Sequence, residues 1–582
     1  MNPSTAQALV MVDEFLRCGV TDAVVCPGAR STPLALALAE AEARGDVRLH
    51  VRLDERTAGY LALGLGKASG VPAIVVTTSG TAAVNLLPAI VEADHSAVPF
   101  IAVTADRPPR LRGVGANQSI EQVAIFSGRT RDEVDMSVAT SEPGQVAYWR
   151  STIARSVARS TDALLPGPVS INVPFDVPLV PDLQSKGWVE ELSGRSDGRP
   201  WTADARLVAG MSTPLDDVLS ALLDNTVVPA HGVIIVGDHS DAESIDLIDD
   251  LGDALGWPVI AEPSGNAGGC ATALSHGPLL AADAGFSSTH VPDLVITVGR
   301  VGLHRSVLAL ISAAQLHIAV DARPDWSDPT RSADLVVASV PLPPEAAEYD
   351  EQWLADWQLA DVLAAAAVET VMSAEGDRLS GVSVARITAQ SVPTSGLLFL
   401  AASSVVRHVS TFAATSIRDG SVLGNRGTSG IDGCMSTAWG SAVAHESMGG
   451  SSSIALVGDQ AFWYDSNALL VPAQEERPRL TYVVSDNDGG GIFSSLEQGH
   501  LDHEEHFERV FGVPLGVDIA AFAQAVGIPV VVVSDGPALT AALESAIGDG
   551  VRIIVAKVMG RAEEAALLET VSLAVASALS PQ

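Results

Sequence analysis

The chain carries few basic residues for its size. Its 582 residues include 34 Lys and Arg against 70 Asp and Glu, which gives a formal net charge of -36. An average field of this sign repels phosphate, so it argues against nucleic acid and against an anionic membrane surface as partners. The basic residues are almost all Arg, and Arg placed in the clefts of an acidic protein suits the bidentate binding of carboxylates.

Long apolar runs and paired cysteines are also lacking. No run of about 18 apolar residues is present, and the first residues lack the basic-then-apolar pattern of a signal peptide, so we expect no membrane insertion. The four cysteines include no C-x-x-C pair; they are Cys18, Cys26, Cys270 and Cys434. We therefore expect reduced cysteines in a cytoplasmic protein.

Aromatic residues make up only 4% of the chain, whereas hydrophobic residues make up 47%. The chain is too long for one ordinary core, which favours several domains. Short apolar runs alternate with helical stretches and with turns rich in Gly, Ser, Asp or Pro, and this order is typical of βαβ units. We predict an α/β fold of three doubly wound domains with mainly parallel sheets, at residues 1–180, 200–345 and 370–582.

The third predicted domain carries the strongest chemical pattern. One strand ends at Gly458 and Asp459, and the next strand along the chain ends before Asn487 and Gly489. Ligands bind at the carboxyl ends of such strands, so both polar tips are expected to meet at one edge of the sheet. Carboxylate, amide and carbonyl oxygens are ligands that Mg²⁺ or Mn²⁺ prefers, and the glycines allow the backbone to approach a diphosphate.

This pair of tips resembles the metal and diphosphate signature of the thiamine-diphosphate enzymes. Gln460 stands where that family usually has its third glycine, and Asp486 stands before Asn487. The resemblance implies a pyrimidine-binding domain, a central domain and a diphosphate-binding domain, with thiamine diphosphate as the cofactor. It also implies a carboxylate against the aminopyrimidine ring, for which Glu55, at the start of a helical stretch, is the candidate.

Further segments narrow the resemblance to the 2-succinyl-5-enolpyruvyl-6-hydroxy-3-cyclohexene-1-carboxylate synthases of menaquinone biosynthesis. These segments occur in the same order as in that family; they are Cys26–Leu34, Thr78–Ala82, Thr104–Pro108, Gly115–Gln118, Gly424–Gly427, Ser429–Gly433 and Gly489–Phe493. The family joins 2-oxoglutarate to isochorismate with loss of CO₂. Both substrates are dicarboxylates, which agrees independently with the expected use of Arg in a cleft.

The resemblance assigns roles to particular residues. The group derived from 2-oxoglutarate on the cofactor would be held by Ser403, Arg407 and Arg426. Isochorismate would be held by Arg30, Arg107, Asn117, Gln118 and Arg305. Cofactor contacts would come from Glu55, Ile431, Gly458, Asp459, Asn487, Gly489, Gly490, Ile492 and Phe493, and Leu496 would join Phe493 in an apolar wall.

The metal ligands implied are Asp459, Asn487 and Gly489. In thiamine enzymes the activating Glu and the diphosphate site usually come from different subunits, so we expect a homodimer or homotetramer with active sites at the subunit interface. The sequence departs from the family pattern at Ala29, Tyr464 and His304, which affects substrate affinity more than the reaction class.

Two other functions stay open. One is another thiamine-dependent 2-oxo-acid decarboxylase or ligase, similar to acetolactate synthase, which would accept pyruvate. The second is a non-catalytic thiamine-binding relative. The Arg residues argue against the first, and the joint presence of Glu55, Asp459 and Asn487 argues against the second.

The histidines at positions 500, 503 and 506 are the remaining candidate metal ligands. They lie three residues apart beside Glu504 and Glu505, but position 507 is Phe, so the spacing of zinc proteases is not met. We interpret this stretch as a polar loop or helix.

Overall fold

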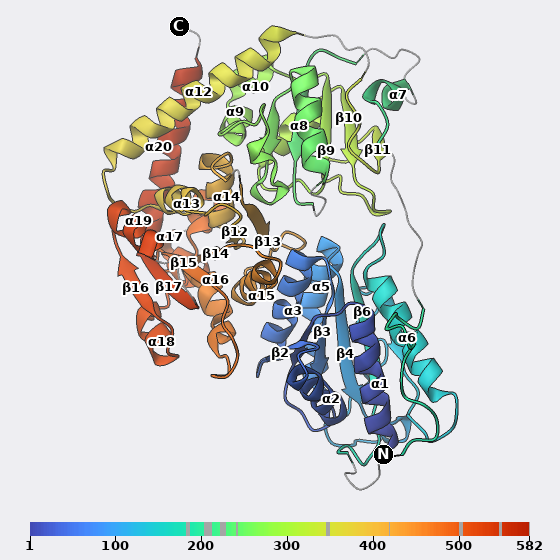
Figure 1. Ribbon diagram of the computed structural model, residues 1–582. Coiled ribbons are helices and arrows are strands. Elements are labelled where there is room, and N and C mark those ends of the chain that lie inside the picture. The colour runs from blue at the N-terminus through green and yellow to red at the C-terminus, as the bar shows by residue number, and fades with distance from the viewer. Residues whose placement is uncertain are drawn as a thin grey trace. The chain divides into compact units, whose positions relative to one another are not determined.

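The structure is a computed structural model that describes residues 1–181, 187–202, 212–220, 228–239, 243–344, 350–417, 419–499, 504–545 and 550–580. Within this part of the chain, three sheets alternate with helices, and every strand pair in them is parallel (Figure 1). The predicted α/β class with mainly parallel sheets is therefore confirmed. By its internal contacts the chain forms two compact units, and the first contains Met1–Val208, Asn425–Gly449 and Tyr464–Pro478.

The sheet of the first unit has the strand order β2-β1-β3-β4-β6-β5. Its strands are β1 (Asp22–Val25), β2 (Arg48–Val51), β3 (Ala73–Thr77), β4 (Phe100–Asp106), β5 (Asp132–Asp135) and β6 (Pro168–Pro174). The helices are α1 (Pro3–Arg17), α2 (Thr32–Ala43), α3 (Glu55–Ser69), α4 (Thr81–Val84), α5 (Leu87–Ser96), α6 (Gln145–Ser160) and α15 (Cys434–Ser447), with short 3-10 turns η1 (Pro109–Leu111) and η4 (Ser466–Leu469).

Helices cover both faces of this sheet. Side chains of α1, α2 and α6 form one apolar core with the strands, which includes Phe15, Leu38 and Trp149. Helices α3 and α5 contact each other on the opposite face (Figure 1). Because β1, β3 and β4 are buried on both sides, they contain the apolar runs 23–25, 73–76 and 100–103 rather than alternating patterns.

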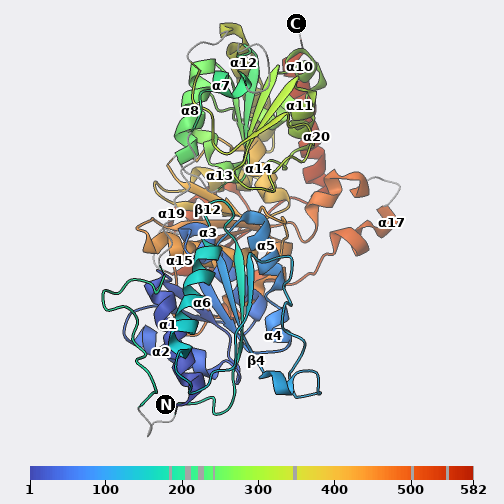
Figure 2. The same ribbon diagram turned by 90° about the vertical axis from the view of Figure 1, so that its right-hand side faces the viewer.

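The second unit contains the other two sheets. One has the order β11-β10-β9-β7-β8, and its strands are β7 (Gly232–Val236), β8 (Val259–Ala261), β9 (Leu294–Val298), β10 (Leu316–Val320) and β11 (Leu335–Val337). Its surrounding helices are α7 (Leu215–Ser220), α8 (Glu243–Leu255), α9 (Gly277–Ala282), α10 (Ala284–Thr289) and α11 (Arg305–Ala313), with turns η2 (Pro263–Gly265) and η3 (Ala267–Gly269). Figure 2 shows α8 and α11 on opposite faces of this sheet.

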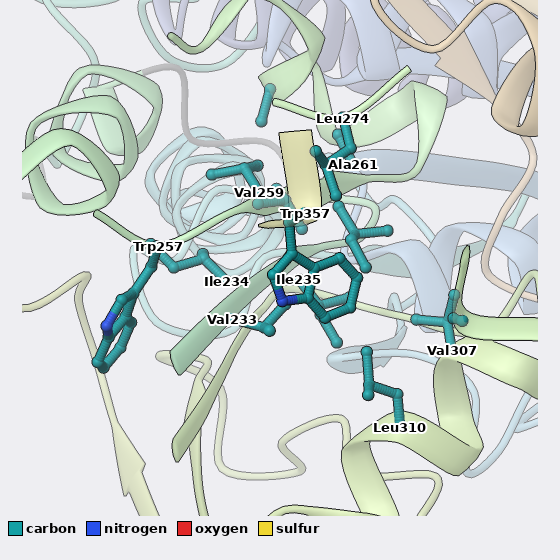
Figure 3. Packing of buried hydrophobic residues seen from close by; sticks show 14 of the residues in the cluster. Val233, Ile234, Ile235, Trp257, Val259, Ala261, Leu274, Val307, Leu310 and Trp357 are labelled. Carbon is teal, nitrogen blue, oxygen red and sulfur yellow. The ribbon is translucent and has the colours of Figure 1, made fainter. Parts of the chain in front are cut away.

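An apolar cluster fills the space around this sheet. Val233, Ile234 and Ile235 of β7 are fully buried and pack with Trp257, and Trp357 joins the cluster from the long helix α12 (Glu351–Ala374) (Figure 3). Trp353 on the same helix donates its indole N–H to the Gly232 carbonyl at 2.8 Å. The burial of Trp353 and Trp357 anchors α12 to the second sheet.

The third sheet has the order β13-β12-β14-β15-β17-β16. Its strands are β12 (Leu397–Leu400), β13 (Ser421–Gly424), β14 (Ser453–Gly458), β15 (Leu480–Asp486), β16 (Val530–Val533) and β17 (Val551–Lys557). The remaining helices are α13 (Gly381–Gln390), α14 (Ser404–Phe412), α16 (Asp459–Tyr464), α17 (Glu504–Phe507), α18 (Ile519–Ala525), α19 (Gly536–Ser545) and α20 (Arg561–Leu579), with 3-10 turns η5 (Gly491–Ser495) and η6 (Glu497–Gly499) and a π turn, Glu508–Gly512.

The first and third sheets share one strand order, counted along the chain. In each, the first strand lies between the second and the third, so the direction of winding reverses there. Such a reversal leaves a crevice outside the carboxyl ends of the strands, where ligands bind in open α/β sheets. The fold therefore places candidate sites after β1 and β3 and after β12 and β14. No described helix is long and apolar enough to cross a membrane.

Helices α3 and α15 of the first unit cross at unusually close range because each carries a glycine at the contact. A Cβ on Gly64 would lie 2.1 Å from the Thr437 carbonyl oxygen, and a Cβ on Gly440 would lie 2.2 Å from the Leu61 carbonyl oxygen. Any side chain at these two positions would force the helices apart.

We expect Gly64→Ala and Gly440→Ala each to lower the free energy of unfolding by about 1–3 kcal/mol, the usual effect of overpacking a core. Chemical denaturation monitored by circular dichroism measures this effect. Gly302→Ala is the matched control, since a Cβ there meets nothing within 4 Å. Unchanged stability in both helix variants would show that the crossing tolerates separation.

The N-terminus of α15 is held by a buried carboxylate. Asp465 is fully buried and accepts the Ser436 backbone N–H at 2.7 Å. Burial raises the pKa of Asp465 to about 7, against the lowering effect of its hydrogen bonds to Ser436.

This pKa shift predicts a pH dependence of stability. A carboxyl group whose pKa is higher in the folded state stabilises the fold below its unfolded value near pH 4, and that contribution is lost as the pH rises through 7. Asp465→Asn is expected to flatten the decline in unfolding free energy between pH 4 and pH 7. Parallel pH profiles for the variant and the wild type would contradict this assignment.

Candidate functional site

The carboxyl ends of β14 and β15 form the centre of the candidate site. These strands are direct neighbours, with Gly458 opposite Ser485, as predicted from their order in the sequence. Asp459 begins α16 immediately after β14, and its Oδ2 accepts the Gly489 backbone N–H at 2.6 Å. Asp459 and the loop that carries Asn487 and Gly489 are therefore in contact.

This edge of the sheet has the electrostatic character of a cation site. Burial, and after it the negative charge of Asp486, raises the pKa of Asp459 to about 7. The Asn487 Oδ1 is buried and accepts no hydrogen bond from the described residues. A buried carboxylate and an orphaned amide oxygen are costly unless a cation satisfies them, and both are suitable ligands for Mg²⁺.

The donor set contains a single carboxylate. Among the described residues, no group of three or more His, Cys, Asp or Glu side chains is arranged to hold a metal. A magnesium ion here would take one carboxylate, one amide and one backbone carbonyl, and would complete its shell with phosphate and water oxygens. The residues present fit a diphosphate-bound Mg²⁺ better than an ion held by protein side chains alone.

The loop after β15 depends on glycine for its shape. Gly489 has a φ of +143°, and a Cβ there would lie 2.2 Å from the Gly512 carbonyl oxygen. A Cβ on Gly490 would lie 2.4 Å from the Phe511 carbonyl oxygen. Both positions therefore require a residue without a side chain, because the backbone of residues 511 and 512 packs directly against them.

The turn after β12 lies at the point where the third sheet reverses its winding. Ser403, just before α14, has a φ of +79° and a ψ of -135°, a backbone conformation that residues other than glycine rarely adopt. Arg407 Nη1 donates to the Ser403 carbonyl oxygen at 2.8 Å. The structure thus brings these two predicted residues together. The backbone of Ser403 is strained, and strained residues of this kind are concentrated at functional sites.

We name the loop Asn487–Gly490 the metal loop. The predicted apolar residues follow it, Ile492 and Phe493 in η5 and Leu496 just after η5. The ring of Phe493 lies 5.5 Å from that of Phe511, measured between centroids. Ile492 is half-buried and Leu496 is exposed. Arg305, at the start of α11, pairs with Glu497 at 2.9 Å through side chains that are 83% and 70% exposed. Arg305 is therefore next to this segment, but its present partner is a carboxylate of the protein.

Glu55 is the first residue of α3 in the first unit. Asp54 caps the helix by accepting the Arg56 backbone N–H, and Glu55 is half-buried, with Asn85 Nδ2 3.4 Å from its Oε2. The preceding turn is fixed by Arg52, which donates to both carboxylate oxygens of Glu475 at 2.8 Å. Glu55 consequently lies on a rigid turn and presents its carboxylate at the N-terminal end of a helix.

Arg30 and Arg107 come together after β1 and β4. Arg107 donates to Ser79 Oγ, Ser79 Oγ donates to the Gln118 carbonyl oxygen at 3.0 Å, and Gln118 Nε2 donates to the Ser79 carbonyl oxygen at 3.0 Å. Burial and then the like charge of Arg107 lower the pKa of Arg30. Asn117 is exposed in the same turn as Gln118.

The surroundings of Arg30 and Arg107 in the first unit are suited to an anion. Arg30 Nε is buried and has no hydrogen-bond partner among the described residues. Two guanidinium groups that repel each other and leave a buried donor unsatisfied are stabilised by a bound carboxylate. Ser79 was not among the predicted site residues, although it lies in a segment that carried the family resemblance. Its contact with Arg107 needed the structure.

Arg426 and Ile431 lie on the loop before α15, which is also part of the first unit. Glu92 of α5 accepts the backbone N–H groups of Gly427 and Thr428 at 2.8 and 2.6 Å. Tyr60 donates to Asp432 at 2.7 Å. Arg426 is buried, and its Nε has no hydrogen-bond partner in the described structure. Like Arg30, it has a buried donor available for an anion.

Two of the three residues that depart from the family pattern make local contacts, and nothing in the structure explains Ala29. Tyr464 is 52% exposed, and the Arg56 guanidinium lies 4.9 Å from its ring centroid. His304 Nε2 lies 3.1 Å from Ser410 Oγ. His500 and His503 lie outside the described residues, and His506 is on α17.

The predicted site residues are divided between the two units. Asp459, Asn487 and Gly489 are in the second unit, whereas Glu55, Arg30, Arg107 and Arg426 are in the first.

Comparisons with known proteins agree with this geometry. Residues 6–125 match the thiamine pyrophosphate enzyme N-terminal TPP binding domain, and residues 411–556 match the corresponding C-terminal TPP binding domain. Glu55 is in the first match, and Asp459 and Asn487 are in the second.

Curated relatives cover nine tenths of the chain or more. A 2-succinyl-5-enolpyruvyl-6-hydroxy-3-cyclohexene-1-carboxylate synthase of Thermobifida fusca is 44% identical over 100% of both chains. Proteins of the same name from Saccharopolyspora erythraea and Mycobacterium avium are 42% identical over 91% of both chains, and 38% identical over 96% of this chain and 97% of the relative. The chain therefore belongs to the 2-succinyl-5-enolpyruvyl-6-hydroxy-3-cyclohexene-1-carboxylate synthase family of thiamine pyrophosphate enzymes.

Proposed function

We propose that the protein decarboxylates 2-oxoglutarate and adds the resulting four-carbon unit to isochorismate. The products are CO₂ and 2-succinyl-5-enolpyruvyl-6-hydroxy-3-cyclohexene-1-carboxylate, an intermediate of menaquinone biosynthesis. The observation that carries the choice of substrates is a pair of guanidinium groups, because Arg30 and Arg426 each keep a buried Nε without a described partner. Two dicarboxylate substrates supply the anions that such groups need.

Thiamine diphosphate is the cofactor, and Mg²⁺ or Mn²⁺ is the proposed metal. Asp459, Asn487 and the Gly489 carbonyl oxygen would hold the metal, and the loop at Gly489 and Gly490 would approach the diphosphate. Thiamine supplies the electron sink for loss of CO₂ and for the new carbon–carbon bond. The orphaned Asn487 Oδ1 and the buried Asp459 support this placement.

The chain's own residues bind, orient and exchange protons. The Glu55 carboxylate would hold the proton shared with the aminopyrimidine ring, and Ile431 would support the bent cofactor. Ser403, Arg407 and Arg426 would orient the group derived from 2-oxoglutarate. Isochorismate would be held by Arg30, Arg107, Asn117, Gln118 and Arg305, against the apolar side chains of Ile492, Phe493 and Leu496. Orientation of two bound reactants replaces a bimolecular encounter and accounts for much of the rate.

The curated relatives support this activity over one with pyruvate. They carry the same name and extend over nearly the whole chain. A decarboxylase or ligase similar to acetolactate synthase would not require this pair of arginines. Domain boundaries at 1–180, 200–345 and 370–582 stay a prediction.

A homodimer or homotetramer is part of the proposal. Apolar side chains next to Glu55 and Asn85 are open to solvent in the single chain: Leu53 is 75% exposed, and Val84 and Leu87 are exposed by 40% and 37%. A second copy that covers this face would bury them and enclose Glu55.

We also propose a cytoplasmic location, since the four cysteines, all in the described part of the chain, form no disulfide.

Glu55→Gln is the direct test of the activating carboxylate. We expect the rate of CO₂ release from 2-oxoglutarate, measured with thiamine diphosphate, Mg²⁺ and isochorismate, to fall by roughly 100-fold or more, because proton transfer loses its carboxylate. Affinity for thiamine diphosphate should change much less. Pyruvate is the control substrate, and turnover of pyruvate in place of 2-oxoglutarate would favour the alternative enzyme class. Undiminished CO₂ release by Glu55→Gln would remove Glu55 from the mechanism.

Arg107→Met tests the proposed isochorismate site. Loss of a charged hydrogen-bond donor is expected to raise the KM for isochorismate by roughly 10- to 100-fold, while the KM for 2-oxoglutarate stays unchanged. Steady-state kinetics that follow the loss of isochorismate absorbance measure both values. Arg110→Met is the control, because Arg110 is exposed and pairs with Asp176. An equal rise in both KM values would mean that Arg107 serves the fold and not isochorismate.

Leu53→Asp tests the proposed subunit interface. Light scattering of the wild type should give a multiple of the chain mass of 60.0 kDa. A charge at Leu53 is expected to shift the protein towards the monomer and to reduce activity with it, because Glu55 is then left uncovered. Leu573→Asp, at a similarly exposed leucine of α20, is the control. A wild-type protein that is monomeric and fully active would contradict the interface.

A further inference from the structure

The metal loop of the second unit is held from outside by a structure that the proposed mechanism does not use. We name the π turn Glu508–Gly512 the cap turn. Its last carbonyl oxygen, that of Gly512, accepts the Gly490 backbone N–H at 2.8 Å. The ring of Phe511 in the same turn lies 5.5 Å from the ring of Phe493. The cap turn thus contacts both Gly490 and Phe493.

Gln460 supplies a second link to the cap turn. It follows Asp459 directly, and its Nε2 donates to the same Gly512 carbonyl oxygen at 3.1 Å. The Gly512 carbonyl oxygen therefore accepts two hydrogen bonds. One comes from the side chain of Gln460, which follows Asp459, and the other from the backbone of Gly490, which lies three residues after Asn487. The glycine expected at position 460 by resemblance could not make this bond, because it has no side-chain donor.

Arg561 supplies the third link, from the first turn of α20. Its Nη1 donates to the Asn487 carbonyl oxygen at 3.1 Å and also to the Asp488 carbonyl oxygen. Its Nη2 pairs with Glu508 of the cap turn. The side chain of Arg561 is only 12% exposed, and its charge-assisted hydrogen bond to the Asn487 carbonyl oxygen is partly buried. The contacts with Asp488 and Glu508 are at the surface.

We propose that Gln460 and Arg561 are positioning residues that fix the backbone from Asn487 to Gly490 by joining it to the cap turn. Their effect is on the affinity for magnesium and thiamine diphosphate, because they orient ligands and the diphosphate-binding backbone without touching the reacting atoms. This inference rests on the proposed metal site at Asp459 and Asn487. It adds the residues that hold that site in shape and gives a role to the departure at Gln460.

Geometry separates this role from a general contribution to the fold. Both side chains donate to backbone carbonyl oxygens within the metal loop or the cap turn, and neither belongs to an apolar core. Supporting hydrogen bonds around a metal site change metal affinity by roughly 10- to 100-fold when they are removed. A residue needed only for stability would instead lower the melting temperature of the cofactor-free protein and leave the affinity of the folded fraction unchanged.

The test compares Gln460→Met and Arg561→Met with the wild type. Methionine keeps much of the side-chain length and removes the donors. Thiamine diphosphate is titrated into the cofactor-free, full-length protein at a fixed MgCl₂ concentration in a calorimeter, and MgCl₂ is titrated at saturating thiamine diphosphate. We expect both apparent dissociation constants to rise by roughly 10- to 100-fold, with kcat at saturating cofactor nearly unchanged. Arg561→Lys should recover part of the affinity, because it keeps one charged donor.

Arg509→Met is the matched control, since Arg509 is an exposed arginine in the same cap turn. It should bind both Mg²⁺ and thiamine diphosphate as the wild type does. If Arg561→Met fails to fold, Gln460→Met, at a half-buried position, decides the question alone.

Wild-type affinity in folded Gln460→Met and Arg561→Met would overturn the inference, and so would a loss of kcat with no loss of affinity. These outcomes leave the proposed function intact. A wild-type protein that gives no heat with thiamine diphosphate and Mg²⁺ would instead overturn the proposed function on which the inference rests.

Discussion

The buried carboxylate of Asp459, at the carboxyl end of β14, is the constraint on which the rest of the structure depends. Asp459 lies against the loop that begins at Asn487, and Asp486 on the neighbouring strand raises its pKa further after burial. Such an arrangement is unfavourable in isolation, because a buried carboxylate needs a counter-charge. A divalent cation that carries a diphosphate would supply this counter-charge, so the same buried carboxylate becomes a binding site.

The arginines of the first unit have the opposite requirement. Arg30 and Arg107 repel each other, and the buried Nε of Arg30 lacks a described partner. The protein therefore contains one place that is incomplete without a cation and another that is incomplete without an anion. A magnesium-bound cofactor and carboxylate substrates meet these two requirements, which links the chain's acidic composition to its few, well-placed basic side chains.

Much of the fold follows from the sequence because parallel sheets have a strong local signature. The apolar runs at 232–236 and 294–298 coincide with β7 and β9, since strands that are buried on both faces need no alternation. The adjacency of β14 and β15, and with it the contact between Asp459 and the loop at Asn487, also follows from their order. The identical strand order of the first and third sheets was not visible in the sequence, because topology leaves no local pattern.

The candidate site was only partly accessible from the sequence. Residue types in family motifs point to Glu55 and Asp459. By contrast, Ser79, Asn85 and Arg561 are linked to the candidate site by hydrogen bonds to residues 28 or more positions away. Such contacts depend on the packing of loops, which residue spacing does not encode. In the sequence Gln460 is only a departure from a motif, and its hydrogen bond to Gly512 gives that departure a physical reason.

The most direct measurement of the central claim is the position of the metal. Crystals of the protein grown with thiamine diphosphate and Mn²⁺ allow the ion to be located by its anomalous scattering. We predict one peak at about 2.0–2.3 Å from an Asp459 carboxylate oxygen, Asn487 Oδ1 and the Gly489 carbonyl oxygen, with diphosphate oxygens completing the shell. A bound cofactor whose metal lies away from these three oxygens would contradict it.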